Sequence, residues 1–463
     1  MTTLSRDAPG LDDLADLTDA LPPGAVLTGS DSVAAYRFDY TADPDAGTPL
    51  AVVRATSAAD VQTTVRWAAG HSVPLVPRGA GSGLSGGSNA VDGCVVLSLE
   101  QMRAIAVDPA TRTAVVEPGA LNAEVKRAAA EHGLWYPPDP SSFEICSIGG
   151  NVATNAGGLC CVKYGVTTDY VLGLDVVLAD GTLVRLGGER IKDSAGLSLV
   201  KLFVGSEGTL GVVTRATLRL VPAQAPPATL VATFDDVADA ARAVVAIGGR
   251  LRASMMELMD HASINAVEDY RAMGLDRDAG ALLVAQSDAP GEARGVEIAL
   301  MEQLCTRNGS RECFTTTDPD EGELFVAARR AAIVAIERRG TLMLEDVGVP
   351  VPRLPELLTG IAEIARHRGV EIPVVAHAGD GNTHPVIVHP PGDEDARERA
   401  AIAFREVMTL AIGLGGTITG EHGVGRLKRA ALPEQLGPDV MALTHRIKTA
   451  LDPQGILNPG AGF

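Results

Sequence analysis

A glycine-rich stretch at residues 77–88, Pro-Arg-Gly-Ala-Gly-Ser-Gly-Leu-Ser-Gly-Gly-Ser, constrains the fold of this chain more than any other feature. Gly81, Gly83 and Gly86 match the spacing of the dinucleotide fingerprint of Rossmann folds. In a Rossmann fold, however, that loop runs directly into a helix whose N-terminus binds the pyrophosphate. Here the chain continues into an apolar run at 94–99 that predicts a strand. The sequence therefore excludes a Rossmann fold.

The chemistry of a glycine-rich loop still applies to this stretch. Backbone N–H groups without neighbouring Cβ atoms can approach phosphate oxygens closely, and Arg78 is available as a charge partner. A loop that only turns tightly is the alternative that this segment leaves open.

A second unusual run, at 137–142 and 147–158, combines small and hydrogen-bonding residues with little apolar content. We expect it to be one extended segment that wraps a large polar ligand.

The pattern of the remaining chain predicts an α+β protein with a boundary at the proline-rich linker 221–227. The first fifty residues form a lead-in. Before the linker we expect strands at 50–54, 73–76, 94–99, 104–107, 113–117, 170–178, 182–186 and 211–220, and helices at 11–21, 57–70 and 121–132. After it we expect strands at 229–234, 282–286 and 341–347, a hairpin at 374–389, and helices at 237–247, 292–306, 324–338, 354–368, 395–414 and 439–451.

Composition excludes several classes of function. The 463 residues carry a formal net charge of -19 without a basic stripe, which argues against binding to nucleic acid or to an anionic membrane. The first ten residues show no secretory signal pattern, and no segment approaches the roughly 18 apolar residues of a membrane span. We expect a cytoplasmic protein. The six cysteines include no Cys-x-x-Cys pair, which predicts free thiols and no iron-sulfur cluster, and we interpret Cys160 and Cys161 as small buried residues.

The hairpin at 374–389 carries the clearest candidates for a metal site. Gly-Asp-Gly-Asn forms its turn, and strands that paired His377 with His384 would bring both imidazoles within reach of one cation. Glu421 is a candidate carboxylate ligand and His422 an adjacent base. The alternative is that these histidines are structural residues of a polar turn and a core strand. His389 follows His384 by an odd number of residues, so we place it on the other face as a structural residue.

Three runs taken together, at 77–87, 146–158 and 205–211, resemble flavoproteins of the vanillyl-alcohol oxidase and p-cresol methylhydroxylase type. The runs at 377–384, 420–425 and 457–460 are similar to the 2-hydroxy-acid branch of that family. This branch includes the glycolate oxidase flavin subunit and the D-lactate and D-2-hydroxyglutarate dehydrogenases. The resemblance extends from about Leu50 to the C-terminus.

The resemblance implies a two-part FAD-binding domain of the vanillyl-alcohol oxidase type with an α+β substrate cap domain. We place the FAD-binding domain at 1–225, the cap at 226–412, and a segment that returns to the FAD domain at 413–463. The implied FAD-binding residues are Pro77, Arg78, Gly79, Gly81, Ser82, Gly83, Leu84, Pro138, Asp139, Ser142, Ser147, Gly149, Gly150, Asn151, Thr154, Gly157, Gly158, Glu207, Gly208, Gly211, Val212 and Asn458.

The resemblance also assigns the catalytic groups. It implies that His377, His384 and Glu421 are ligands of a divalent metal, zinc or manganese, and that His422 is the substrate base. Arg329 is similar to the family's substrate-carboxylate arginine, and Arg330 is a rival for that role. The implied activity is FAD-dependent, metal-assisted oxidation of a D-2-hydroxy acid, D-lactate or glycolate-like, to the 2-oxo acid, with hydride transfer to the flavin.

Two departures from the family pattern narrow these expectations. The family's hydroxyglutarate dehydrogenases carry a lysine in the strand that corresponds to 341–345, where this chain has apolar residues, so a dicarboxylate substrate is the less favoured alternative. Members with covalent flavin carry a histidine or cysteine where this chain has Ser82 and Gly149, which implies noncovalent FAD.

Two rival functions come from other classes. A metal-dependent hydrolase would also use two histidines and a glutamate, but it leaves the glycine-rich loops unexplained. A flavin-binding electron-transfer subunit without its own turnover is the second. The expected partners are a small 2-hydroxy acid and an unidentified electron acceptor, and a homodimer is the assembly we keep in view. Oxygen, a quinone, a cytochrome and an electron-transfer flavoprotein all stay open as acceptors.

Overall fold

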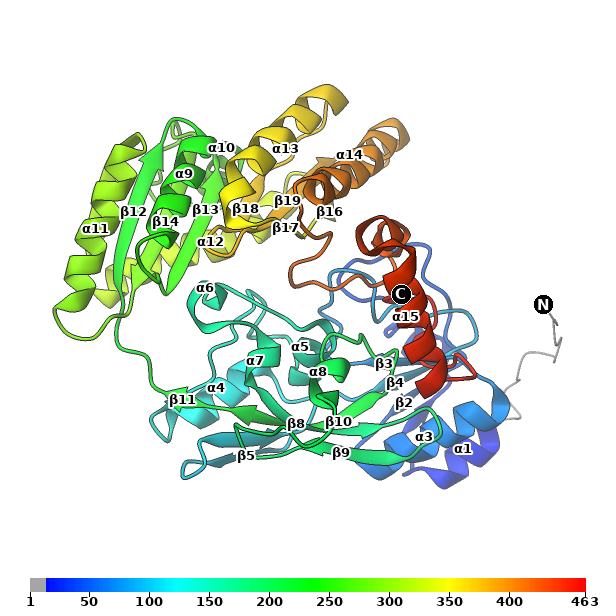
Figure 1. Cartoon of the computed structure of the whole chain (residues 1–463). Helices are drawn as coiled ribbons and strands as arrows, with labels where there is room; N and C mark the ends of the chain where they lie inside the picture. The colour runs from blue at the N-terminus through cyan, green and yellow to red at the C-terminus, as the bar shows by residue number, and fades with distance from the viewer. Residues whose placement is uncertain (1–13) are drawn as a thin grey trace.

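The computed structural model describes residues 14–463 and places the sheets in two parts of the chain, as Figure 1 shows. The first part contains a four-stranded sheet of order β1-β2-β4-β3 and a five-stranded sheet of order β5-β6-β10-β8-β9. These strands are β1 (Val26–Leu27), β2 (Ala51–Arg54), β3 (Leu75–Arg78), β4 (Val95–Ser98), β5 (Ile105–Asp108), β6 (Thr113–Val116), β8 (Val171–Val177), β9 (Leu183–Gly187) and β10 (Val212–Arg219). A small pair of β7 (Leu134–Trp135) and β11 (Val221–Pro222) lies beside them.

Short helices cover and connect these two sheets. They are α1 (Leu14–Ala20), α2 (Ser30–Ala34), α3 (Ala58–His71), α4 (Asn122–Ala130), α5 (Ile148–Thr154), α6 (Cys161–Tyr164), α7 (Thr167–Tyr170) and α8 (Leu199–Phe203). The N-terminus of α3 has a capping box, in which the Ser57 hydroxyl accepts from the Asp60 amide at 3.2 Å and the Asp60 carboxylate accepts from the Ser57 amide at 3.1 Å. The box satisfies two N–H groups that the helix leaves free, so the chain turns into α3 directly after β2.

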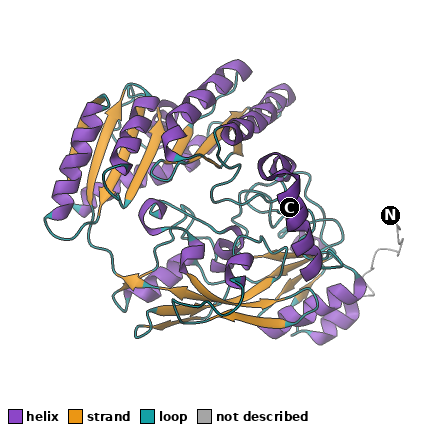
Figure 2. Cartoon of the chain, viewed as in Figure 1, coloured by secondary structure: helices purple, strands orange, loops and turns teal. Residues whose placement is uncertain are grey.

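The second part is an eight-stranded sheet with helices on both faces (Figure 2). Its order is β15-β12-β14-β13-β18-β19-β16, and β17 also pairs with β19. The strands are β12 (Ala228–Phe234), β13 (Met255–Asp260), β14 (Ala281–Ser287), β15 (Ser310–Thr316), β16 (Thr341–Leu344), β17 (Val347–Gly348), β18 (Val374–His377) and β19 (Asn382–His389). The helices are α9 (Val237–Gly248), α10 (His261–Tyr270), α11 (Ala293–Arg307), α12 (Pro319–Glu337), α13 (Leu354–Arg368) and α14 (Glu394–Gly413).

Strand alternation decides which side chains of this second sheet face which layer of helices. One core joins the sheet to α9, α11, α13 and α14, and the other joins it to α10 and α12. On β18, Val374 and Ala376 belong to the first core and Val375 to the second. Because alternate residues share a face, His377 points to the side of α10 and α12, and the same count along β19 places His384 on that side too.

The C-terminal segment returns to the first part of the chain after α15 (Leu432–Leu451), a helix that is broken at Gly437. Leu457 forms a parallel bridge with Leu75 of β3, and the Asn458 amide donates to the Leu75 carbonyl at 2.8 Å. Ile456 and Leu457 are buried in the core of the four-stranded sheet. The glycine-rich loop that follows β3 is therefore held by residues almost four hundred positions further along the chain.

Several sequence expectations need correction. The run at 137–158 is not one extended segment, because the Ser147 hydroxyl caps α5 within it by accepting from the Gly150 amide. The strands β13 and β15 and the helix α10 were not predicted, although Asn308-Gly309 directly before β15 is a turn signal. The lead-in contains α1, β1 and α2, and β1 pairs with β2. The predicted start of its helix at Leu11 lies outside the described residues.

The hairpin also differs in register from the expectation. His377 pairs with Asn382, and His384 pairs with Val375, so the two histidines are diagonal neighbours rather than direct partners. Diagonal residues on one face of a sheet still contact each other when the side chains are long. His389 lies on the opposite face from His384 by the same alternation, as predicted. Among residues 14–463, no helix combines the length and the apolar character that a membrane span requires.

The packing of α5 makes a testable prediction about its two glycines. A Cβ on Gly149 would lie 2.7 Å from the Pro118 Cβ and 2.9 Å from the Pro118 carbonyl oxygen, whereas a Cβ on Gly150 would come no closer than 3.5 Å to the Ser147 hydroxyl. We expect Gly149→Ala to lower the free energy of unfolding by about 1–3 kcal/mol through overpacking. The matched Gly150→Ala should be neutral or stabilising by up to about 1 kcal/mol, because alanine favours a helix over glycine. Thermal melting of the two variants without added ligand measures both, and equal melting temperatures would contradict the account.

Candidate functional site

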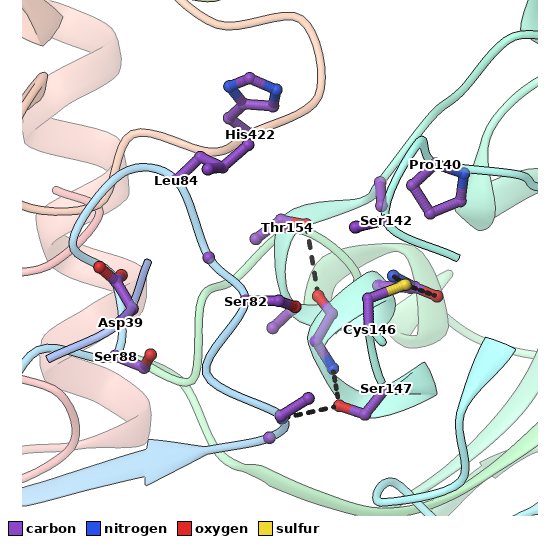
Figure 3. A pocket seen from close by; sticks show the side chains of 18 of the residues that line it. Asp39, Ser82, Leu84, Ser88, Pro140, Ser142, Cys146, Ser147, Thr154 and His422 are labelled. Carbon is purple, nitrogen blue, oxygen red and sulfur yellow. Dashed lines mark hydrogen bonds between the residues drawn. The ribbon is translucent and has the colours of Figure 1, made fainter. Parts of the chain in front are cut away.

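Residues of both parts of the chain line one cavity, part of which Figure 3 shows. Most of the predicted FAD-binding residues line it: Pro77, Arg78, Gly79, Gly81, Ser82, Gly83, Leu84, Ser142, Ser147, Gly149, Gly150, Asn151, Thr154, Glu207, Gly208, Gly211 and Val212. At one end the lining includes His384, Glu421 and His422, and in Figure 3 His422 lies beside Leu84 and away from Ser147. The glycine-rich loops and the histidine cluster therefore share one cavity.

The two glycine-rich loops touch each other through Ser147. Its hydroxyl accepts from the Ala80 amide at 3.2 Å in addition to capping α5. A Cβ on Gly79 would lie 2.4 Å from this hydroxyl, so the close approach requires glycine at that position. The result is a cavity wall made mainly of backbone, with α5 beginning at its surface.

The C-terminal segment holds the same wall from behind. The side-chain Nδ2 of Asn458 donates to the backbone carbonyls of Gly87 and Glu207 at 2.8 and 2.7 Å. The Glu207 carboxylate accepts from the backbone amides of Val424 and Gly425 at 2.9 and 2.8 Å. Glu207 has a positive φ of 52°. These bonds join the first loop, the 205–211 run and the tail into one unit.

Five predicted FAD-binding residues lie outside the cavity lining: Pro138, Asp139, Gly157, Gly158 and Asn458. The structure places them in supporting contacts. The Asp139 carboxylate accepts from the Cys160 amide at 3.1 Å, and Gly158 packs against the Asp139 backbone so closely that a Cβ there would lie 2.3 Å away. Gly157 packs against the carboxylate of Glu421. These residues therefore support the cavity wall without lining it.

Three predicted metal ligands converge at the end of the cavity. Oε1 of Glu421 lies 3.0 Å from Nε2 of His377 and 3.2 Å from Nε2 of His384. The two imidazole rings are almost perpendicular, with centroids 5.0 Å apart. Donor atoms of the three residues lie within 4.8 Å of one another, a spacing that suits one cation. The cluster comes from β18, β19 and the loop after α14, although the direct cross-strand pairing expected from the sequence is absent.

Each histidine of this cluster has a buried carboxylate behind it. Oε1 and Oε2 of Glu257, on β13, lie 2.8 and 3.0 Å from Nδ1 of His377. Oδ1 of Asp346 lies 3.7 Å from Nδ1 of His384. Burial by itself lowers the pKa of His377, but the attraction of Glu257 and Glu421 outweighs it and holds that pKa well above its ordinary value. The pKa of Glu421 is held well below its ordinary value, because His377 and His384 outweigh the effect of burial. The site therefore attracts positive charge.

Asp346 also folds the loop that carries Glu421 and His422. Its Oδ2 accepts from the Thr419 hydroxyl at 2.7 Å and from the amides of Gly420, Glu421 and His422 at 2.9, 2.9 and 2.8 Å. A carboxylate that accepts several backbone N–H groups keeps its negative charge even when buried. The loop is thereby fixed with Glu421 toward the two histidines and His422 toward the cavity.

His422 differs from the other histidines in its surroundings. Its ring stacks on His384 with centroids 4.8 Å apart and an interplanar angle of 7°. Nδ1 of His422 is buried without a hydrogen-bond partner among the described residues. Burial lowers the pKa of His422 to about 4, so the imidazole is neutral near pH 7. A neutral imidazole on the cavity wall can accept a proton.

The two arginines named as substrate candidates both line the cavity from α12. Arg329 is buried, and its Nε forms an ion pair with Oε2 of Glu257 at 2.9 Å. Neither Nε nor Nη2 has a hydrogen-bond partner among residues 14–463. Arg330 is more exposed, pairs with Glu323 at 2.8 Å and lies over the Phe143 ring at 5.6 Å. Arg330 also has a buried Nε without a partner, but Arg329 is the more buried of the two and shares Glu257 with His377.

Sequence reasoning missed several of these groups. Glu257 and Asp346 are acidic residues in or beside strands, and the signal that could have revealed them is a single carboxylate inside an apolar run, as in Met-Met-Glu-Leu-Met at 255–259. Asp39 and Tyr40 of the lead-in, together with Ile333, Val334 and Leu344, also line the cavity. No local pattern distinguishes this last group from ordinary core or loop residues.

Comparison with known proteins identifies FAD-related domains in both parts of the chain. Residues 49–187 match the family model described as "FAD binding domain", and residues 224–461 match "FAD linked oxidases, C-terminal domain". The chain is 39% identical over 430 residues to "Glycolate oxidase subunit GlcD" of Bacillus subtilis. These residues cover 92% of this chain and 92% of the relative. It is 36% identical over 459 residues to "D-lactate dehydrogenase" of Archaeoglobus fulgidus, covering 97% of this chain and 98% of the relative.

Two solved structures share the fold. A p-cresol methylhydroxylase with substrate bound superposes with a TM-score of 0.80 at 19% identity, over 97% of this chain and 96% of that one. A 4-ethylphenol oxidase from Gulosibacter chungangensis, in complex with isoeugenol, superposes with a TM-score of 0.79 at 20% identity over 98% of both chains. The expected fold, of the p-cresol methylhydroxylase type, is confirmed.

Proposed function

Because this chain belongs to the FAD-linked oxidases, we propose that it oxidises a small D-2-hydroxy acid, D-lactate or glycolate-like, to the 2-oxo acid. The observation that carries the proposal is that one cavity is lined both by the glycine-rich loops and by His384, Glu421 and His422. Relatives that are 32–39% identical include a glycolate oxidase subunit and D-lactate dehydrogenases. In this assignment residues 226–412 are the substrate cap.

Two buried polar atoms in the cavity lack hydrogen-bond partners that FAD could supply. Nη1 of Arg78 and Oδ2 of Asp39 are buried without partners among the described residues, and both residues line the cavity. A flavin dinucleotide offers phosphate oxygens to a guanidinium and hydroxyl groups to a carboxylate, which are the partners that these two atoms lack. When bound, FAD supplies the acceptor for the two electrons and the hydrogen that leave the substrate.

The donor set of His377, His384 and Glu421 fits a divalent cation, with zinc as first choice and manganese as second. Two imidazole nitrogens and one carboxylate oxygen are a ligand set that suits zinc and leaves a position for a small ligand. Glu257 lies at Nδ1 of His377 and would keep the proton there, so that Nε2 could give up its own proton and become a ligand of the cation. The cation would supply Lewis-acid attraction for the carboxylate and 2-hydroxyl oxygens of the substrate.

The chain's own residues supply the remaining chemistry. His422 takes the proton of the substrate hydroxyl, because it is neutral near pH 7 and lies on the cavity wall. Arg329 uses its unpaired Nη2 to bind the substrate carboxylate through a charge-assisted hydrogen bond. Ile333, Val334 and Leu344 line the same cavity, and these aliphatic side chains favour a substrate with a small or apolar side chain.

The experiment that tests this function is an anaerobic titration of the purified protein with D- and L-2-hydroxy acids. A dehydrogenase of this kind is yellow and is bleached by D-lactate, glycolate or a close analogue, with one equivalent of 2-oxo acid formed for each flavin reduced. A protein that stays colourless after incubation with FAD would contradict the proposal and favour the metal-dependent hydrolase. A yellow protein that no hydroxy acid of the panel bleaches would contradict the proposed turnover.

We predict that the FAD is released intact by acid or heat. Ser82 and Gly149 offer no nucleophile for a flavin bond, and burial raises the pKa of Cys146, the thiol that lines the cavity, so that it stays protonated. Precipitating the protein with acid and measuring flavin absorbance in the supernatant and the pellet checks this expectation. Flavin that remains with the precipitated polypeptide would refute it.

We predict that a chelator abolishes turnover but leaves the yellow colour. The proposed cation ligands lie in β18, β19 and the 419–422 loop, whereas the glycine-rich loops belong to other segments. Turnover with a dye as acceptor should return when zinc or manganese is added back, and the flavin spectrum should be unchanged throughout. Full turnover in a sample shown by elemental analysis to be metal-free would end the proposal of a cation.

Neighbouring residues Glu421 and His422 should respond differently to replacement. His422→Ala should retain FAD and metal but slow flavin reduction by about 10² to 10⁴-fold, the usual contribution of a positioned base. Glu421→Ala should lose metal and recover part of its activity in excess metal, because one ligand of three is missing. Stopped-flow flavin reduction and metal analysis separate the two, with exposed His367→Ala on α13 as the control. Metal loss and metal rescue in His422→Ala would reverse the two roles.

A further inference from the structure

Glu257 is a buried carboxylate that no sequence motif includes, and its contact with His377 is only one of the two that it makes. It lies in the middle of β13, is 1% exposed, and stands between Met256 and Leu258, which belong to the apolar core on the other face of the sheet. Removing a carboxylate from water costs several kcal/mol unless cationic or donor groups surround it. The fold therefore retains Glu257 in its interior for the contacts that it makes.

Those contacts join two functional groups through one carboxylate. Oε1 and Oε2 lie 2.8 and 3.0 Å from Nδ1 of His377, and Oε2 also lies 2.9 Å from Nε of Arg329. All three side chains are almost fully buried, with exposed fractions of 1% for Glu257, 3% for His377 and 3% for Arg329. The interaction is therefore poorly screened by solvent and is geometrically restrictive.

The three residues come from separate elements, so their meeting is a property of the fold. Glu257 on β13 and His377 on β18 are direct cross-strand partners, and both point to the side of the sheet on which α12 lies. Arg329 enters from α12. A change at the carboxylate would consequently be felt both on the strand that carries a cation ligand and on the helix that carries the arginine.

We propose that Glu257 is a positioning residue that couples the cation site to the carboxylate-binding arginine, an inference that rests on the function proposed above. Toward His377 it accepts the Nδ1 proton and so orients Nε2 to the cation, a contact that commonly changes metal affinity. Toward Arg329 it holds Nε and leaves Nη2 free for the substrate carboxylate. Because Oε2 contacts both side chains, a change at Glu257 alters cation binding and hydroxy-acid binding together.

A purely structural role is the competing explanation, since a buried ion pair between β13 and α12 could simply hold the helix to the sheet. That role predicts lower stability after substitution but no change in cation affinity of the folded protein. The two explanations differ in a binding measurement that needs no turnover.

The test is calorimetric titration of chelator-treated, FAD-containing protein with Zn²⁺, with and without a 2-oxo acid product. Glu257→Gln keeps the shape but removes the charge, and we expect its Zn²⁺ affinity to fall about 10 to 100-fold, with a raised KM for the hydroxy acid. The Zn²⁺ affinity of Glu257→Asp should lie between those of the wild type and Glu257→Gln. Glu268→Gln is the matched control, because Glu268 is a buried cap carboxylate that accepts from the amides of Met273 and Leu275.

The product should raise Zn²⁺ affinity in the wild type and raise it less in Glu257→Gln. Zn²⁺ affinity that is unchanged in Glu257→Gln, while the wild type binds Zn²⁺, would overturn the coupling and leave the proposed function standing. A wild type that binds no cation would overturn the cation site and this inference together. If Glu257→Gln does not fold, Glu257→Asp decides the question, since wild-type affinity in that variant contradicts the inference.

Discussion

The end of the cavity that carries His384, Glu421 and His422 depends on one carboxylate, which accepts hydrogen bonds from the backbone of the 419–422 loop. Asp346 follows β16, and its Oδ2 accepts from the Thr419 hydroxyl and from three consecutive backbone amides, those of residues 420–422. The loop has no helix or strand of its own to satisfy these amides, so without Asp346 they would be buried and unpaired. The positions of both Glu421 and His422 follow from this single contact. Lys428 lies behind it, paired with Glu345 at 2.9 Å and donating to the carbonyls of Ile418 and Asp346.

Charge balance explains why a cation suits the other side of this arrangement. The carboxylates of Glu257, Asp346 and Glu421 surround His377 and His384, while Arg329 neutralises part of the charge. Buried charges are retained only where opposite charges and hydrogen bonds compensate them. In the absence of a cation, a proton on His377 provides part of that compensation, as the raised pKa of His377 indicates. Cation binding would displace protons, which is the usual relation between metal affinity and ligand protonation.

Local patterns in the sequence reached much of the fold and the residues of the cluster. The exclusion of a Rossmann fold rested on a motif a few residues long, and the structure has the strand β4 after the loop as expected. In the predicted linker at 221–227, Val221–Pro222 instead forms the strand β11, which pairs with β7. The cluster of His377, His384 and Glu421 was predicted although its strand register was wrong, because diagonal pairing still brings the two rings together. What local patterns could not provide was Glu257 and Asp346. Their roles exist only after β13 and β16 have been placed in one sheet with β18 and β19.

The central claim is that His377, His384 and Glu421 hold a divalent cation that the substrate also contacts. Electron paramagnetic resonance of Mn²⁺ added to chelator-treated, FAD-containing protein tests it directly, because free and bound Mn²⁺ give different spectra. We expect a bound spectrum in the wild type that changes when a 2-hydroxy acid is added without oxygen, and a free-ion spectrum in Glu421→Ala. A wild-type sample that shows only free Mn²⁺, or a bound spectrum that no hydroxy acid alters, would contradict the claim.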